Sequence, residues 1–158
     1  MARIGIIVRE GLLFGVLGGL LAVIVLVDDV LVTNSLNTSA FADFVTSALT
    51  LLVIGGAGRK IAAITGSSTA GVQMGALAGG VIELFRVLGG SLVISYLPAA
   101  QTAVQHMSAA DRAISNDPTK WIPDLAFALA LAIVFGAIIG WLGAWSLLQF
   151  RPPRQPPR

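Results

Sequence analysis

The sequence places an acidic and a basic residue three positions apart in the middle of a long apolar run. They are Glu83 and Arg86, within residues 67–97. On an α-helix, residues three apart lie on the same side, so these two side chains can form an ion pair. An ionisable residue inside a membrane span costs at least about 2.5 kcal/mol on insertion scales, and is therefore a candidate functional group in a proton or cation path.

The alternative interpretation of this charged pair is structural. An ion pair at this spacing neutralises itself and can fix helix packing or the register of an oligomer. The other apolar runs of the chain have no charged residue in the middle, whereas an ion path needs further polar groups at the same depth. The sequence therefore favours the structural interpretation and leaves the transport interpretation open.

The same run contains a ladder of small residues at intervals of four, which leads to Glu83. At ~100° per residue, a step of four drifts by only ~40°, so the ladder forms one stripe along a helix. Backbones approach closely where side chains are missing, and we expect another helix to pack on each such stripe. The predicted packing positions are Gly71, Gly75 and Gly79 in this run, and Gly11, Gly15, Gly19, Gly136 and Gly140 in two others.

The composition predicts that the elements carrying these residues lie in a membrane. Of the 158 residues, 56% are hydrophobic and 11% are charged, against about 25% charged in soluble domains. We therefore expect an all-α integral membrane protein, with residues 1–158 forming a single domain. The predicted transmembrane helices are residues 11–32, 41–57, 68–97 and 122–150, the third capped by Ser67 or Ser68.

Two further segments lie outside the predicted spans. Residues 99–116 have apolar positions at helical period, which indicates an amphipathic helix on the outer surface or capping the bundle. Asp117 and Pro118 end this segment, and Pro123 suits the first turn of the fourth helix. The tail, residues 151–158, is basic and too rich in proline to be helical.

The basic residues predict the orientation of the spans. Lys and Arg gather on one side of the predicted topology, so both termini are expected on the cytoplasmic side of an inner or plasma membrane. A cleaved signal peptide ending at residues 40–42 is the competing interpretation, but the apolar region before it is longer than such peptides have. One side carries Arg3, Arg9, Arg59, Lys60, Arg151, Arg154 and Arg158, and the other carries Arg112 and Lys120.

The chain contains a candidate internal repeat. Two sets of positions match within it, which predicts two parallel hairpins of related pattern. Chance matching is the alternative, because small residues at intervals of four are common in membrane helices. The first match aligns Gly11, Gly15 and Gly19 with Gly71, Gly75 and Gly79, and the second aligns Asp43 and Gly55 with Asp124 and Gly136.

The remaining polar residues have simpler interpretations. Asp43 and Asp124 are expected in the first turns of their helices, where the dipole favours a carboxylate. Asp28 and Asp29 are adjacent and point to different sides of a helix, so they make a poor chelate. The single histidine, His106, excludes bis-histidine haem within this chain.

The aromatic and sulfur chemistry also favours a structural role. Trp141 and Trp145, one turn apart, are interpreted as packing and interface anchors. The chain has no cysteine, which excludes a thiolate metal site. We expect no cofactor and no metal.

The sequence favours a protein that is not an enzyme, because it contains no nucleophile motif, phosphate loop or zinc spacing. The formal charge of +2 comes from residues at span ends, which indicates topology and not nucleic-acid binding. We expect a small membrane protein that assembles through glycine-rich helix packing, as a homo-oligomer or an accessory subunit. The alternative is a small transporter or channel using Glu83 and Arg86 in an intramembrane groove. A third hypothesis is a lipid, a pigment or another apolar ligand held in that groove.

Overall fold

The protein is all-helical over the residues that the computed structural model describes, which are 2–33, 36, 39–109 and 117–150. The described helices are α1 (Ala2–Thr33), α2 (Ala40–Thr65), α3 (Ser68–Tyr96), α4 (Pro98–His106) and α6 (Pro118–Gln149). Four of them, α1, α2, α3 and α6, are long and apolar enough to cross a membrane. The predicted helical class and the four long apolar helices are therefore confirmed.

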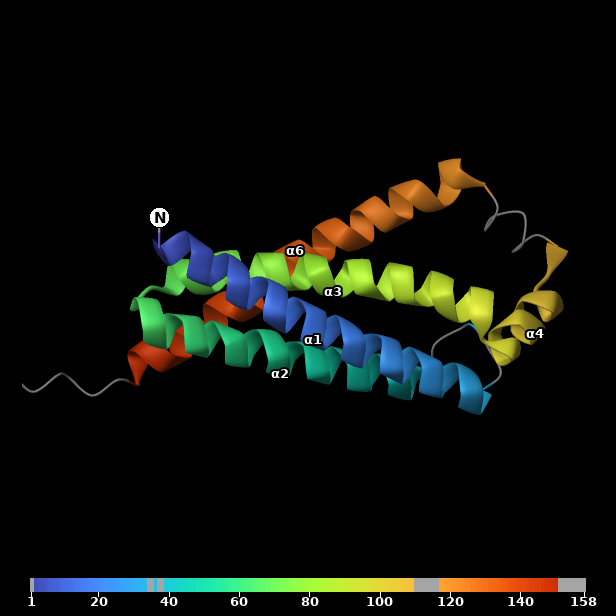
Figure 1. Ribbon diagram of the computed structural model, residues 1–158, viewed down its shortest axis with the longest axis horizontal. Helices are drawn as coiled ribbons and strands as arrows, with labels where there is room; N and C mark the ends of the chain where they lie inside the picture. Colours follow the sequence, from blue (N-terminus) through green and yellow to red (C-terminus); the bar gives the residue numbers. More distant parts are fainter. Residues whose placement is uncertain (1, 34–35, 37–38, 110–116, 151–158) are drawn as a thin grey trace, which may run out of the picture.

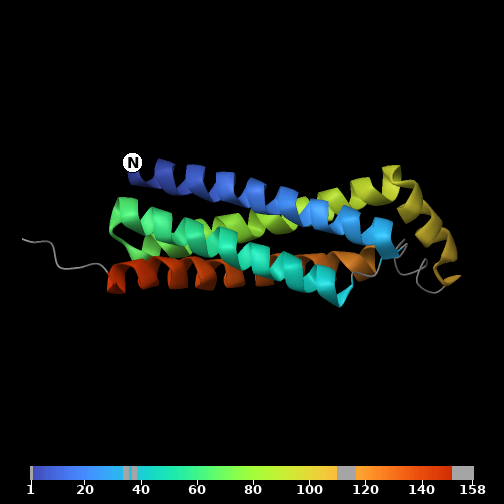
Figure 2. The same ribbon diagram turned by 90° about the horizontal axis from the view of Figure 1, so that it is seen from below.

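The long helices run side by side in one elongated bundle (Figures 1 and 2). The start of α1, the connection from α2 to α3 and the end of α6 lie at one end, which we call the basic end. The short helix α4 lies at the opposite end, which we call the α4 end. Around the bundle, α1 packs on α2 and α3, and α6 packs on α2 and α3.

The helix boundaries follow from local capping. The Gly66 backbone has φ 69°, in the left-handed region, and its N–H donates to the Ala62 carbonyl at 2.8 Å, which ends α2. Ser67 then takes the N-cap position of α3, as expected. Helix α2 continues past the predicted span end at 57, because Ile61 and Ala62 bury their side chains in the core.

The start of α6 corrects two expectations. Asp117 caps this helix by accepting from the Thr119 N–H at 3.1 Å, and Pro118 is its first residue. Pro123 therefore lies inside the helix and Asp124 beyond the first turn, and the predicted first-turn placement of both residues is wrong. Asp43 does lie in the first turn of α2, as expected.

Helix α4 covers the first part of the segment expected to be amphipathic. Its two buried residues, Ala100 and Ala103, are one turn apart, whereas Gln101, Gln105 and His106 are exposed. Residues 110–116 of that segment lie outside the described residues, as does the basic tail, 151–158.

The two glycine stripes that align in the sequence pack on different partners. A Cβ on Gly75 would overlap the Gly136 carbonyl oxygen, and one on Gly79 would overlap the Ala132 carbonyl oxygen, so α3 meets the α6 backbone directly. The three aligned glycines of α1 instead receive side chains of α3. An exact repeat would turn the α1 stripe toward α2, so the two hairpins are not packed equivalently. The α1 contacts are Gly11 with Leu77, Gly15 with Val81 and Gly19 with Phe85, and those of the α3–α6 pair also include Gly71 with Gly140 and Ala144.

Candidate functional site: a groove around Glu83 and Arg86

Glu83 lies where the close packing of α3 on α6 ends. It follows Gly79 by one step of the ladder, and the Gly79 contact with Ala132 is the last of the backbone contacts along that stripe. Among the α6 residues whose burial is described, the buried ones are all in the C-terminal half, namely Gly136, Gly140, Gly143 and Ala144. Figure 1 shows the first half of α6 diverging from α3. This divergence leaves room for a carboxylate at the next step of the stripe.

The charged pair is asymmetric in its surroundings. Glu83 is only 8% exposed, whereas the Arg86 side chain is 56% exposed. Arg86 Nη1 lies 3.7 Å from Glu83 Oε2, which is a charge contact longer than a hydrogen bond. The carboxylate therefore lies among the helices, whereas the guanidinium is largely exposed.

A cavity of about 370 Å³, which we call the deep cavity, lies beside this pair. Helices α2, α3 and α6 line it. Its polar side carries Glu83 and Arg86 from α3 and three hydroxyls of α2, those of Thr46, Ser47 and Thr50. The other lining residues are apolar or glycine: Leu51, Ile54, Gly79, Ile82, Ala132, Phe135, Gly136 and Ile139.

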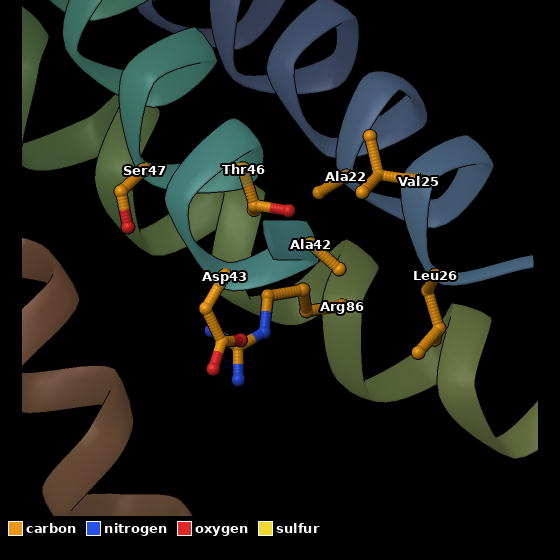
Figure 3. Close-up of a pocket in the computed structure, with 8 residues that line it drawn as sticks. All are labelled: Ala22, Val25, Leu26, Ala42, Asp43, Thr46, Ser47 and Arg86. Atoms are coloured by element: carbon orange, nitrogen blue, oxygen red, sulfur yellow. The ribbon is translucent and has the colours of Figure 1, made fainter. Parts of the chain in front are cut away.

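A second cavity of about 280 Å³, which we call the outer cavity, is lined by residues of α1 and α2 and by Arg86 of α3 (Figure 3). It shares Thr46, Ser47 and Arg86 with the deep cavity, so the Arg86 side chain borders both spaces. Its own charged residue is Asp43, from the first turn of α2. The rest of its lining is Ala22, Val25, Leu26 and Ala42.

The polar face of α2 that completes this site was not predicted from the sequence. Asp43, Thr46, Ser47 and Thr50 recur at intervals of three and four, which puts them on one side of the helix. The observation that no other span has a charged residue in its middle still holds, but these uncharged hydroxyls give Glu83 polar neighbours from α2.

The hydroxyls of this face are available to a ligand. Ser91 and Ser95 of α3 donate to carbonyls one turn back, at 3.0 and 2.8 Å, as helical serines commonly do. Over the ranges that the structure covers, Thr46, Ser47 and Thr50 make no such bond. Their oxygens therefore keep their full capacity to accept and donate.

A second buried carboxylate, Glu10, was also missed. It is 3% exposed, accepts from Lys60 Nζ at 2.6 Å and accepts from Arg9 Nη2 at 2.9 Å. Lys60 also lies over the Phe14 ring, 5.3 Å from its centroid, a distance at which a cation is attracted to the ring face. One signal in the sequence could have identified Glu10. It is the one acidic residue among the basic residues of the basic end.

The pair Asp28 and Asp29 is divided as expected, with the two side chains in different environments. Asp28 is exposed, whereas Asp29 is buried and accepts from the Ser39 N–H at 2.9 Å and from the Ser39 hydroxyl at 2.5 Å. Ser39 in turn caps α2 by accepting from the Ala42 N–H at 3.2 Å. Asp29 therefore closes the α1–α2 hairpin at the α4 end.

The other candidate residues stay apart from the groove. His106 is exposed at the end of α4, and Trp141 and Trp145 stack with their ring centroids 6.2 Å apart on the exposed side of α6. Within the described ranges, no three His, Cys, Asp or Glu side chains come together to hold a metal ion.

Comparisons of this chain with protein-family models, curated proteins and solved structures found no match.

Proposed function

We propose that this chain is a non-enzymatic integral membrane protein that admits a small polar or charged solute to the groove around Glu83 and Arg86, as a small transporter or channel does. One observation carries the proposal: a charged pair near the middle of α3 and three unpaired hydroxyls in the first half of α2 line one cavity between long apolar helices. The basic residues further favour an inner or plasma membrane with both termini cytoplasmic.

The exposure of Arg86 supports a hydrated groove. Glu83 lies fifteen residues after Ser68, roughly 22 Å along a helix that rises ~1.5 Å per residue. A half-exposed guanidinium at that depth would be costly in lipid, and it is tolerated where water or a counter-charge meets it. The deep cavity, at about 370 Å³, has room for several waters, because each occupies about 30 Å³ in the liquid.

Site-directed labelling tests whether the groove holds water. The chain has no cysteine, so Thr50→Cys adds a single thiol inside the deep cavity. Leu52→Cys is the matched control, since Leu52 lies on the same helix, is 72% exposed and lines neither cavity. In liposomes, water-soluble charged thiol reagents should modify the Thr50→Cys protein and spare the Leu52→Cys protein, whose thiol would face lipid and stay protonated. Equal protection of both thiols would overturn the proposal.

Flux measurements test whether the groove transports. Liposomes containing the full-length protein should take up solute ions faster than empty liposomes, and Glu83→Gln should abolish the difference. Glu10→Gln is the control, because Glu10 is also buried but borders neither cavity. A flux that survives Glu83→Gln would remove this residue from the mechanism.

A second proposal is assembly, as a homo-oligomer or as an accessory subunit of a membrane complex. The first half of α6 favours it, because that half diverges from α3 and carries large exposed apolar side chains such as Phe127, which is 65% exposed. The glycine stripes contact helices of the same chain, so assembly would use this α6 face. Native mass spectrometry in mild detergent should show a defined oligomer that Phe127→Glu disrupts, and a monomer would contradict it. The same spectra would show a bound lipid or another apolar ligand.

A further inference from the structure

We infer that the outer and deep cavities form one path for small monovalent cations, in which Asp43 attracts the ion and Arg86 is the barrier before Glu83. This inference rests on the proposed function and adds the class of solute and the residues that select it.

The charges around the two cavities favour a cation. The ionisable residues lining them are two carboxylates, Asp43 and Glu83, and one guanidinium, Arg86. The α1 and α6 residues of the lining are apolar or glycine, so they add no charge. With all three groups ionised, the lining has a formal charge of −1. A cleft lined by excess negative charge and low-dielectric walls concentrates cations and repels anions.

The ligands favour a weakly held monovalent ion over a multivalent metal. The two carboxylates come from different helices, and Arg86 borders both of their cavities. Tight sites for Ca²⁺ or transition metals need several carboxylate, imidazole or thiolate ligands together, and no such group occurs in the ranges the structure covers. The hydroxyls of α2 supply neutral oxygen ligands beside a single carboxylate, that of Glu83, in the deep cavity.

Arg86 is placed to control passage between the cavities. Its side chain lines the outer cavity (Figure 3) and also the deep cavity, and it is 56% exposed. At 3.7 Å from Glu83, its guanidinium is attracted to the carboxylate without being locked to it by a hydrogen bond. Because Arg86 borders both cavities, a cation moving from Asp43 to Glu83 comes close to this positive group, so neutralising Arg86 should lower the barrier.

The test uses the full-length Thr50→Cys protein in phosphatidylcholine liposomes. Its thiol is labelled with the cationic 2-trimethylammonioethyl methanethiosulfonate or the anionic 2-sulfonatoethyl reagent, and each rate is divided by that reagent's rate with free 2-mercaptoethanol. We expect a cationic preference of about tenfold. Asp43→Asn should reduce the preference. Arg86→Gln should raise the cationic rate by about threefold or more, whereas Arg86→Lys, which keeps the charge, should leave it near the starting value.

Rubidium flux gives a second readout on the same variants. Arg86→Gln should increase ⁸⁶Rb⁺ uptake and leave ³⁶Cl⁻ uptake at the level of empty liposomes. Equal normalised labelling rates, or rates insensitive to Arg86→Gln in a variant whose circular dichroism matches the parent, would overturn the inference and leave the proposed function standing. Absence of any labelling of the Thr50→Cys protein would overturn both.

Discussion

Two buried carboxylates of this protein, Glu10 and Glu83, have similar burial and different coordination. Glu10 accepts hydrogen bonds from Lys60 and Arg9 at 2.6 and 2.9 Å. Glu83 has a charge contact with Arg86 at 3.7 Å and lies beside a cavity. Burial by itself therefore does not separate the structural carboxylate from the candidate functional one. The coordination of Glu83 does. Its carboxylate makes no hydrogen bond within the described ranges, and no fully buried side-chain oxygen there lacks a partner, so the Glu83 oxygens are accessible to water.

The difference arises from how the helices are spaced. At the basic end, α2 reaches α1, and Lys60 bridges to Glu10 while lying over Phe14. Near the middle of α3, the partner helix α6 has diverged after the contact of Gly79 with Ala132. The Glu83 carboxylate therefore borders the deep cavity at this point, where closer packing would have placed an α6 side chain.

The largest expected effect comes from breaking the close helix contact on which this spacing depends. Gly75→Leu would force a side chain into the Gly136 carbonyl, and overpacking against backbone costs roughly 3 kcal/mol or more. We expect misfolding or a large fall in melting temperature in mild detergent. Gly56→Leu is the matched control, because a Cβ there meets nothing within 4 Å. Equal melting temperatures for the two variants would contradict the α3–α6 contact.

A smaller loss is expected when the fully coordinated carboxylate is removed. Glu10→Gln leaves Arg9 and Lys60 without their buried partner. The free energy of unfolding should fall by only about 1–2 kcal/mol, because both cations are themselves partly exposed. The melting temperature should fall while cation flux, normalised to folded protein, stays the same. Asp28→Asn at an exposed carboxylate should change neither quantity. A loss of flux in Glu10→Gln without unfolding would show that Glu10 also takes part in transport. It would contradict the distinction between the two carboxylates.

The hairpin end offers an intermediate case. Ser39→Ala removes both the α2 cap and the hydroxyl that donates to Asp29, and losing a cap costs about 1 kcal/mol. Hydrogen exchange should increase at the first turn of α2 more than at its last turn. Ser39→Thr, which keeps the hydroxyl, should retain most of the protection, and uniform exchange along α2 in Ser39→Ala would argue against this capping role.

The helices and the location of Glu83 could be predicted from sequence, whereas the groove could not. Apolar length predicts the four long helices, and the step from Gly79 to Glu83 predicts a carboxylate facing another helix. The point where α6 departs depends on backbone contacts of Ala132 with Gly79, which residue types alone do not specify. Thr50 and its neighbouring hydroxyls were missed because helical hydroxyls usually bond to carbonyls one turn back and carry no charge.

The smallest expected effect on stability comes from the carboxylate beside the cavity. Glu83→Gln removes a charge whose contact with Arg86 is longer than a hydrogen bond, and it also removes the cost of keeping that charge buried. The two contributions oppose each other, so the free energy of unfolding should change by less than about 1 kcal/mol, in either direction. Cation flux should nevertheless be lost, because the amide has no charge with which to attract the ion. Glu10→Gln and Glu83→Gln then form a reciprocal pair, one lowering the melting temperature and the other the flux. A large destabilisation by Glu83→Gln would show that Glu83, like Glu10, has a structural role. It would contradict the proposal that the cavity beside Glu83 is a functional site.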